Sequence, residues 1–252
     1  MCTASWSVSA TEATLCFNRD ERKIRPEAEA LAAHESENGK LLFARDPQGG
    51  GTWLCANEAG LCSFLLNNYG ATAKLALQRK RFSGGRSRGD LTIGCCQQAS
   101  LPGAERWLRS LDLDSYKPFL LGLMSLGNSV VLSWDGCRIV RLASDIRFLT
   151  TSSFQTEEVE AYRKNRYIEI CGDDASLCSL RRRISYHFDT AHPSSAYNPL
   201  MRREESETQC VTMVSIRKTS TLMRLQTRPF EVDGFEGGQE MELERAAPEL
   251  RE

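Results

Sequence analysis

Short apolar, β-prone segments separated by polar turns run through most of the chain. The first two, residues 3–8 and 14–18, flank the polar stretch 9–13 and predict a β-hairpin. Antiparallel strands of similar length would place Cys2 opposite the end of the second strand. That end carries the tetrapeptide Asn-Arg-Asp-Glu at 18–21. The hairpin is therefore expected to bring a cysteine next to an arginine and two acids.

Further strands are predicted wherever an apolar run is bounded by glycine-rich or polar turns. They cover residues 40–45, 51–56, 60–69, 118–127, 129–134, 137–143 and 146–151, and a late hairpin has strands near 209–217 and 220–226. The apolar run within 60–69 has no polar face. That pattern is typical of a strand in the centre of a covered sheet.

Four segments have helical patterns: 88–99, 102–111, 153–170 with a capping Thr156, and 174–188. Within 102–111, apolar residues recur at helix spacing behind an early proline. Two stretches have no such pattern. Residues 25–39 are predicted to be a polar connection, and residues 69–88 an irregular loop rich in glycine and arginine.

The order of the elements is strands, helices, strands, helices, strands. It favours an α+β fold in which two mainly antiparallel sheets carry helices on their outer faces. A doubly wound parallel fold fits less well, because the βαβαβ rhythm is missing and no glycine-rich dinucleotide fingerprint follows a strand. A chain of 252 residues is long enough for one large core. We expect a single domain over 1–228 and an acidic, flexible tail at 229–252.

The charge balance and the lengths of the apolar runs indicate which classes of partner to expect. The net charge is −1, and 26% of the residues are charged. This balance lacks the basic excess of nucleic-acid-binding proteins, so no nucleic-acid partner is expected. The sequence has no secretory signal pattern and no apolar run approaching the roughly 18 residues that a membrane span needs. We therefore expect a cytoplasmic protein without a membrane span.

The chain has ten cysteines and three histidines. They form no C-x-x-C pair and no histidine cluster, so neither a metal site nor a cofactor is expected. Most of the cysteines lie in apolar runs, where a thiol acts as a small hydrophobic group. Cys2 differs because it directly follows Met1.

Cys2 is the candidate nucleophile. Methionine aminopeptidase removes an initial methionine when the second residue is small, which would leave a free α-amine on the cysteine itself. An α-amine has a pKa of about 7.7–8.0, so it is partly neutral at pH 7. It could then accept the thiol proton directly or through a water. This arrangement needs no histidine.

The neighbouring polar residues could complete such a site. Arg19 near the thiol would favour the thiolate, and Asp20 near the amine would orient it. Neighbouring strand residues point to opposite faces, so both acting on Cys2 would require a bend at the strand end. An amide donor for an oxyanion would come from Asn67 or Asn68. Taken alone, the tetrapeptide at 18–21 is typical of a charged turn, and Asn67-Asn68 is more often a turn signal than an oxyanion hole.

Seven motifs together resemble the NRDE family, the family of transport and Golgi organisation protein 2. They are MCT at 1–3, NRDE at 18–21, GGTWLCANEAGL at 50–61, LLNNY at 65–69, SRG at 87–89, LTTSSF at 149–154 and MRREESET at 201–208. The resemblance covers the chain up to about residue 227. More distantly, the pattern is similar to choloylglycine hydrolases and penicillin acylases. It implies the four-layer αββα sandwich of the N-terminal-nucleophile hydrolases.

The resemblance also implies roles for individual residues. It makes Cys2 the nucleophile and, through its amine, the base. It places Arg19 beside the thiol and Asp20 beside the amine. It assigns the oxyanion-hole amide to Asn68, where larger family members have a threonine, an asparagine and a tyrosine in sequence.

Two positions depart from the hydrolases. Their second active-site asparagine falls on Thr151, whose hydroxyl also donates a hydrogen bond but with a different reach. Their late active-site arginine falls on Gln209, with Arg203 as the alternative from another turn. Thr151 and Arg203 are therefore candidate substrate-binding residues. Loss of one oxyanion donor costs about 10²–10³ in rate, so the departures bear on activity.

Two functions remain open from the sequence. The first is an enzyme that cleaves or transfers an acyl group at a linear, non-peptide C–N amide bond through a Cys2 thioester, with a small molecule as substrate. The second is a binding protein on the same scaffold that holds and transfers a lipid, an acyl-CoA or haem. Fold alone does not decide between them.

Overall fold

The computed structural model describes residues 1–77, 85–174 and 178–245, which form two antiparallel sheets. The first sheet has the strand order β10 (Phe148–Thr151), β1 (Cys2–Val8), β2 (Glu12–Arg22), β11 (Ser206–Arg217), β12 (Ser220–Thr227) and β13 (Gln239–Glu244). The second sheet is a meander in chain order: β3 (Ala32–Ser36), β4 (Gly39–Phe43), β5 (Leu54–Asn57), β6 (Cys62–Asn67), β7 (Phe119–Ser125), β8 (Asn128–Trp134) and β9 (Ile139–Arg141).

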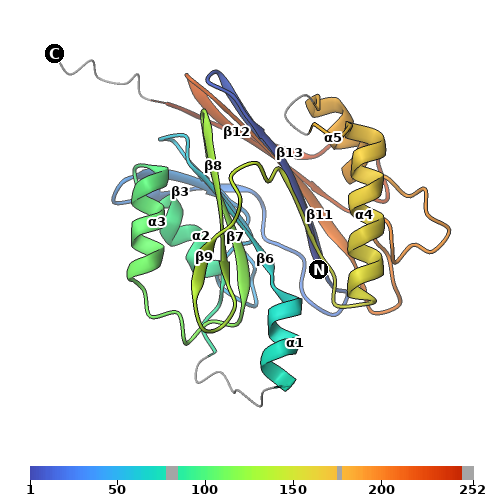
Figure 1. Ribbon diagram of the computed structural model, residues 1–252. Coiled ribbons are helices and arrows are strands. Elements are labelled where there is room, and N and C mark those ends of the chain that lie inside the picture. Colours follow the sequence, from blue (N-terminus) through green and yellow to red (C-terminus); the bar gives the residue numbers. More distant parts are fainter. Residues whose placement is uncertain (78–84, 175–177, 246–252) are drawn as a thin grey trace.

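Helices cover the outer face of each sheet (Figure 1). α2 (Gly89–Cys96) and α3 (Leu101–Ser110) pack on the second sheet, and α4 (Thr156–Cys171) and α5 (Leu180–His187) pack on the first. α1 (Tyr69–Leu77) extends from the end of β6. The molecule is therefore an α+β, four-layer αββα sandwich, as the sequence predicts. Within the described residues, no helix is long and apolar enough to span a bilayer.

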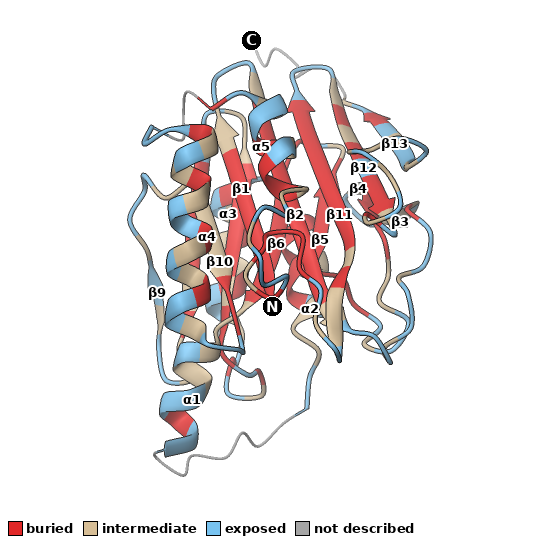
Figure 2. Cartoon of the chain, turned by 90° about the vertical axis from the view of Figure 1, so that its right-hand side faces the viewer, coloured by how far each residue is buried: buried red, intermediate tan, exposed pale blue. Residues whose placement is uncertain are grey.

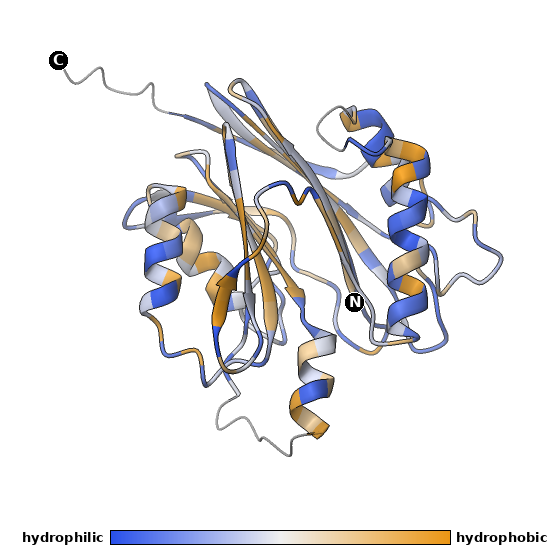
Figure 3. Ribbon diagram, in the orientation of Figure 1, coloured by the Kyte–Doolittle hydropathy of each residue, from blue (hydrophilic) through white to orange (hydrophobic). Residues whose placement is uncertain are grey.

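Apolar side chains from both sheets fill the space between them. Trp6 of β1 and Phe17 of β2 contact Phe64 of β6, with ring centroids 5.1 and 6.4 Å apart. All three side chains are buried. Figure 2 shows long buried runs along the central strands, and Figure 3 shows hydrophobic residues along β6 and β7. Burying a large apolar side chain contributes about 1.5–3 kcal/mol, so this layer is the main source of stability.

A polar layer lies on the other face of the first sheet. Because side chains alternate along β1, Ser5 points away from the apolar core toward α5. Its Oγ lies 2.8 Å from Nε2 of His187, and Nδ1 of His187 lies 2.5 Å from Oδ1 of Asn18. Asn18 Nδ2 donates to the carbonyl oxygens of His187 and Pro199, both at 2.8 Å. Asn18 Oδ1 therefore accepts from Nδ1–H. Burial lowers the pKa of His187 to about 3, so the ring is neutral at pH 7 and its Nε2 accepts from the Ser5 hydroxyl.

The polar connection expected over 25–39 contains a strand, β3. Ala32 of β3 pairs with Phe43 of β4, and the His34 ring stacks on the Phe43 ring with centroids 3.8 Å apart. β3 is an edge strand, so its solvent face is polar and the apolar signal of a strand is weak. For this reason the sequence pattern did not reveal it.

The irregular loop expected over 69–88 begins as a helix. Asn68 caps α1, because its Oδ1 accepts a hydrogen bond from the backbone N–H of Ala71 at 3.0 Å. A capping asparagine satisfies one of the free N–H groups of the first turn. Residues 78–84 of the expected loop lie outside the described residues.

Residues 239–244, expected within the flexible tail at 229–252, form β13 at the edge of the first sheet. Leu243 is buried and Met241 packs against the core between the sheets. Exposed glutamates alternate with these two residues, which gives the segment an acidic composition. The expectation of a loose tail therefore does not hold for β13. Residues 246–252 lie outside the described residues.

Capping of α4 also differs from the expectation. Thr156 is the first helical residue. Gln155, with a left-handed φ of 40°, occupies the N-cap position, but its side chain makes no capping hydrogen bond to the helix. The Thr156 hydroxyl instead donates to the carbonyl oxygen of Ser152 at 2.9 Å. The hydroxyl thus stabilises the turn before the helix.

Candidate active site

Cys2 lies between two strands at one end of the first sheet. It pairs with Arg19 of β2 on one side and with Thr151 of β10 on the other. Residues that pair directly across antiparallel strands project from the same face of the sheet. The predicted hairpin register is therefore confirmed, and it brings the thiol, the guanidinium and a hydroxyl to one face.

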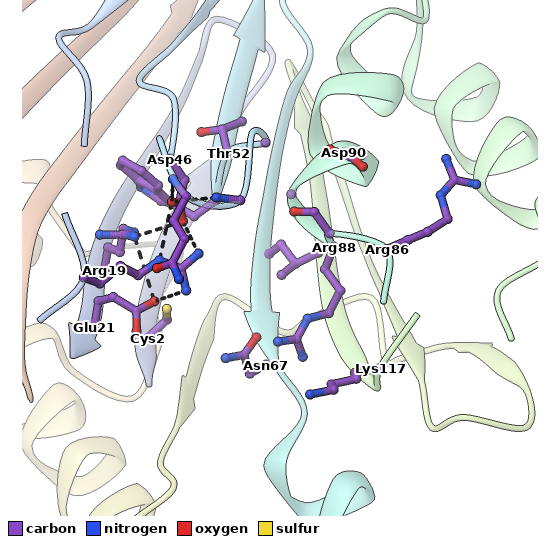
Figure 4. Close-up of a pocket in the computed structure, with 18 of the residues that line it drawn as sticks. Cys2, Arg19, Glu21, Asp46, Thr52, Asn67, Arg86, Arg88, Asp90 and Lys117 are labelled. Carbon is purple, nitrogen blue, oxygen red and sulfur yellow. Dashed lines mark hydrogen bonds and ion pairs between the residues drawn. The ribbon is translucent and has the colours of Figure 1, made fainter. Parts of the chain in front are cut away.

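That face forms one wall of a pocket of about 650 Å³ between the two sheets. Cys2 and Arg19 line the pocket from the first sheet. Figure 4 shows Asn67, Arg88 and Lys117 on the opposite side. Cys2 is only 8% exposed, so a ligand would reach its thiol through the pocket.

Three neighbours hold the Arg19 guanidinium, which is 4% exposed. Nη2 donates to Oδ2 of Asp46 at 3.1 Å, and Nη1 donates to the side-chain oxygen of Gln209. The guanidinium carbon lies 4.8 Å from the centroid of the Trp53 ring. A planar cation that stacks on an aromatic face and donates hydrogen bonds from both terminal nitrogens has little conformational freedom.

An irregularity in β11 delivers Gln209 to Arg19. Thr208 pairs with Asp20 and Cys210 pairs with Arg19, so Gln209 is the extra residue between them. Such a bulge redirects a side chain. The extra residue therefore lies in β11 and not in β2, where the sequence predicts a bend.

Asp46 and Glu21 neutralise Arg19 and Arg25. Arg25 lies 2.6 Å from Asp46 and 3.2 Å from Glu21, and Arg19 lies 3.8 Å from Glu21. Burial raises the pKa of Asp46, but the backbone N–H of Gly49 and the two guanidinium groups outweigh it and lower the pKa below its ordinary value. Asp46 therefore stays ionised, and the cluster holds two cations and two anions.

The Asp20 carboxylate lies on the opposite face of β2 from the Arg19 side chain. Its Oδ1 accepts from the Thr208 hydroxyl at 2.7 Å, and its Oδ2 lies 3.4 Å from Nη1 of Arg163 on α4. The Asp20 and Arg163 side chains are fully buried. Arg163 Nη1 also donates to the Thr3 hydroxyl at 3.1 Å. A buried carboxylate needs such partners to remain charged, and the sequence analysis did not identify Arg163 as one.

Met1 occupies the end of β1 and is itself buried. Its ammonium donates to the Asp20 carbonyl oxygen at 3.3 Å and to the Tyr69 hydroxyl at 3.1 Å. Its carbonyl oxygen accepts from the Asp20 N–H at 3.1 Å, and its sulfur accepts from the Ser152 hydroxyl at 2.9 Å. With Met1 in place, the backbone of Asp20, rather than its carboxylate, contacts the α-amine.

Burial raises the pKa of the Cys2 thiol above its ordinary value. The ammonium of Met1 and the backbone of Asp20 lower it, but they do not outweigh burial and the negative charge of the Asp20 carboxylate. The thiol is therefore protonated at neutral pH while Met1 is present.

The two asparagines at the end of β6 have different environments. Asn67 lines the pocket, and its Nδ2 donates to the Tyr69 hydroxyl at 2.9 Å. Asn68, the residue to which the resemblance assigns the oxyanion amide, does not line this pocket. Its Oδ1 caps α1 and its Nδ2 lies 3.4 Å from the Ser133 hydroxyl. The geometry therefore favours Asn67 as the residue that faces Cys2.

Thr151 and Arg203 also differ in their placement. Thr151 is buried beside Cys2, and its Oγ1 has no hydrogen-bond partner within the described part of the chain. Arg203 does not line the pocket, and its guanidinium carbon lies 5.2 Å from the centroid of the Phe154 ring. The expected pairing of Arg203 with the substrate at Cys2 is thus not supported by its position.

Sequence reasoning missed two further residues at this site, Asp46 and Tyr69. Asp46 contacts Arg19, and Tyr69 contacts Met1. Each contact joins segments that are distant in the chain, and neither Asp46 nor Tyr69 stands out in its local sequence. No group of histidine, cysteine and carboxylate side chains suited to a metal ion occurs among the residues that the structure describes.

The sequence and the fold of the chain can be compared with those of known proteins. The model of the Transport and Golgi organisation 2 family matches residues 1–177 of the 252. The chain belongs to this family. No curated protein matches the chain in sequence.

Two solved structures have the fold of this Transport and Golgi organisation 2 family member. A mutant of the conjugated bile acid hydrolase from Clostridium perfringens is 12% identical, with a TM-score of 0.53 over 97% of this chain and 92% of that one. The N-acylethanolamine-hydrolyzing acid amidase ortholog of Caenorhabditis elegans is 10% identical, with a TM-score of 0.54 over 84% and 92%. At these identities the likeness shows a shared fold and nothing finer.

In this Transport and Golgi organisation 2 family member, the tetrapeptide at 18–21 serves both faces of the first sheet. Asn18 binds His187 in the polar layer, and Asp20 binds the buried Arg163. Arg19 lines the pocket, and Glu21 helps to neutralise the charge of Arg19. Alternation along one strand thus links the pocket to the layer beneath it.

Proposed function

We propose that the protein is an N-terminal cysteine hydrolase or acyltransferase that acts on a non-peptide C–N amide bond through a thioester on Cys2. The observation that carries the proposal is the position of Cys2, at the wall of the pocket and directly opposite Arg19 and Thr151. Support also comes from the fold, which is similar to that of a conjugated bile acid hydrolase and of an N-acylethanolamine-hydrolyzing acid amidase.

Removal of Met1 activates the site in this proposal. With Met1 present, the amine is one residue away from the nucleophile and the thiol pKa is raised by burial. Removal places the α-amine on Cys2 itself, where it serves as the base. It also vacates the space that the buried Met1 side chain fills beside Ser152.

The reaction then proceeds in two halves. The Cys2 amine accepts the thiol proton, and the thiolate attacks the amide carbonyl carbon to form a tetrahedral intermediate. The C–N bond breaks as the Cys2 ammonium returns the proton to the departing amine, which leaves a thioester. Water, or an acceptor amine in an acyltransferase, attacks the thioester carbonyl and restores the thiol.

The remaining residues stabilise charge. Arg19 is held beside the thiol by Asp46 and Trp53 and favours the thiolate. We assign two donors to the oxyanion: the Asn67 amide, which lines the pocket, and the Thr151 hydroxyl. Thr151 does not itself line the pocket, but it pairs with Cys2 on the next strand, and its hydroxyl has no hydrogen-bond partner among the described residues. This assignment replaces Asn68 with Asn67, in keeping with their environments.

A binding role on the same scaffold is the alternative, with a lipid, an acyl-CoA or haem held and passed on. The observation that favours it is the set of contacts around Met1, whose amine, carbonyl and sulfur each have a partner. A chain that keeps Met1 has a buried, protonated thiol, and such a protein would hold a ligand in the pocket without cleaving it.

The two functions differ in the state of the N-terminus and of its thiol. Native protein is treated with a trace of iodoacetamide, and its peptides are mapped by mass spectrometry. The proposal expects Met1 to be removed and Cys2 to be alkylated faster than the other nine cysteines. Retained Met1, or a Cys2 no faster than its neighbours, would contradict the hydrolase and leave the binding role.

A matched control separates processing from activation. Insertion of one alanine between Met1 and Cys2 leaves an alanine at the processed N-terminus, so the α-amine no longer belongs to the cysteine. This variant should lose the preferential alkylation of Cys2. Equal rates in the two proteins would show that the amine is not the base.

A further inference from the structure

The side of the pocket that faces Cys2 carries an excess of positive charge. Arg88 and Lys117 lie on this side, and Asp90 is the acidic residue that lines it with them. No ion pair joins Arg88 or Lys117 to a carboxylate within residues 1–77, 85–174 and 178–245. The Arg19 side differs, since two carboxylates balance its two guanidinium groups.

The Arg88 side chain is held in place. Its Nη1 donates to the carbonyl oxygen of Pro118 at 3.0 Å, and no other described residue binds its guanidinium. Burial lowers the pKa of Arg88, whereas negative charge on Tyr69, on the Cys2 thiolate and on Glu21 raises it. Arg88 and Cys2 line the same pocket.

The backbone beneath Arg88 is tightly packed. A Cβ atom on Gly51 would lie 2.5 Å from the carbonyl carbon of Gly89, and one on Gly89 would lie 2.7 Å from the Thr52 nitrogen. The Thr52 N–H also donates to the Gly89 carbonyl oxygen at 3.3 Å. These contacts between backbones fix Gly89, the first residue of α2, against the residues that lead into β5, and Arg88 directly precedes Gly89.

Arg86 is a useful contrast within the same segment. Figure 4 shows it directed away from Cys2, and its guanidinium carbon lies 5.2 Å from the centroid of the Tyr116 ring. It also lines the pocket and has the same charge as Arg88 two residues away, but its side chain points away from Cys2.

We propose that Arg88, with Lys117, binds an anionic group on the ligand of this pocket, so that the amide substrate carries a carboxylate, a sulfonate or a phosphate. The amide part rests on the function proposed above, whereas the anionic part rests on the opposite wall. A guanidinium with a free edge binds such oxyanions through paired, charge-assisted hydrogen bonds. In a pocket walled by protein, an unpaired cation attracts an anion more strongly than it does in open water.

Two alkylating reagents test the charge preference at Cys2. Iodoacetate transfers a carboxymethyl group to the Cys2 sulfur, and iodoacetamide transfers a carbamoylmethyl group. Both release iodide, but only iodoacetate is anionic. The ratio of the two rates cancels any change in the fraction of thiolate, because both reagents attack the same thiolate. We expect this ratio at Cys2 to exceed that of the uncharged thiol N-acetylcysteine amide in the same buffer.

Variants then assign the preference to Arg88. Arg88→Gln should lower the ratio about fivefold, and raised salt should lower it in the wild type, because surface-accessible charge attraction is screened. Arg86→Gln removes the same charge from the same segment and should leave the ratio close to that of the wild type. An unchanged ratio in Arg88→Gln would overturn the proposal without affecting the nucleophilic role of Cys2.

Ligand binding tests the proposal even if Cys2 reacts with neither reagent. Octanoate, octanesulfonate, octyl phosphate and neutral octanol share one chain and differ in the end group, and Trp53 at the pocket wall reports binding by fluorescence. The wild type should bind one or more of the three anions more tightly than octanol. The anion that binds most tightly identifies the oxyanion that the pocket prefers. Equal binding of octanol, or a preference that persists in Arg88→Gln, would contradict anion recognition here.

Discussion

Asn67 and Asn68 are adjacent, identical side chains with separate roles, and the difference comes from the end of β6. Asn67 is the last residue of the strand and projects into the pocket, whereas Asn68 follows it and caps α1. Substitution of each residue therefore separates charge stabilisation from helix stability.

Asn67→Ala should slow acylation of Cys2 by about 10²–10³, since it removes a donor from the oxyanion. Asn68→Ala should lower the free energy of unfolding by about 0.5–2 kcal/mol through loss of the cap, with little change in acylation. p-Nitrophenyl acetate reports the first effect by release of p-nitrophenolate, and urea unfolding reports the second. If Asn68→Ala instead abolished acylation, the assignment would return to Asn68.

Among the structural elements, the contact between the turn before β5 and the start of α2 sets the shape of the pocket. Gly51 and Gly89 meet there through backbone atoms that cannot move aside as a flexible side chain can. Gly85 lies at the other end of the same wall, where an added Cβ would meet nothing within 4 Å.

Gly51→Ala should therefore destabilise the protein by about 1–3 kcal/mol, the usual cost of overpacking, and should displace the wall that carries Arg88. Gly85→Ala, its control, should change the free energy of unfolding by no more than about 1 kcal/mol. Urea unfolding followed by tryptophan fluorescence measures both. Equal stability of the two variants would show that α2 moves freely away from β5.

Elements that local pattern determines were predictable from the sequence, whereas contacts between distant elements were not. The hairpin of β1 and β2 follows from its apolar runs, so the pairing of Cys2 with Arg19 could be derived. The partnership of Asp20 with Arg163 depends on how α4 docks on the first sheet, which no local spacing encodes. The strands β3 and β13 were missed because edge strands expose one polar face.

At the scale of the whole molecule, the two faces of the first sheet bury different kinds of side chain. The inner face is apolar and packs on the second sheet. The layer between the outer face and the two helices buries Asn18 of β2, Arg163 of α4, and Arg183 and His187 of α5. Two nitrogens of Arg183 have no partner within the part of the chain that the structure describes. Any additional charge in this layer would therefore be costly.

Acid is expected to destabilise the molecule through this layer. Burial, together with the charges of Arg183 and Arg163, lowers the pKa of His187 from 6.5 to about 3. In the unfolded chain the same ring becomes protonated below about pH 6.5. Between these values the unfolded state binds more protons, so the free energy of unfolding falls as the pH falls, by up to about 1.4 kcal/mol per pH unit from this group.

Urea unfolding between pH 7.5 and pH 4 measures this dependence in two variants. His187→Gln should be less stable than the wild type at pH 7.5, because it disrupts the bonds to Asn18 and Ser5. Its stability should then decline less steeply with acid, because the titrating ring is gone. Ser5→Ala removes a hydrogen bond at the same place but keeps the ring, so it should lower stability and retain the steep decline. Parallel curves for His187→Gln and the wild type would show that other groups govern the acid sensitivity.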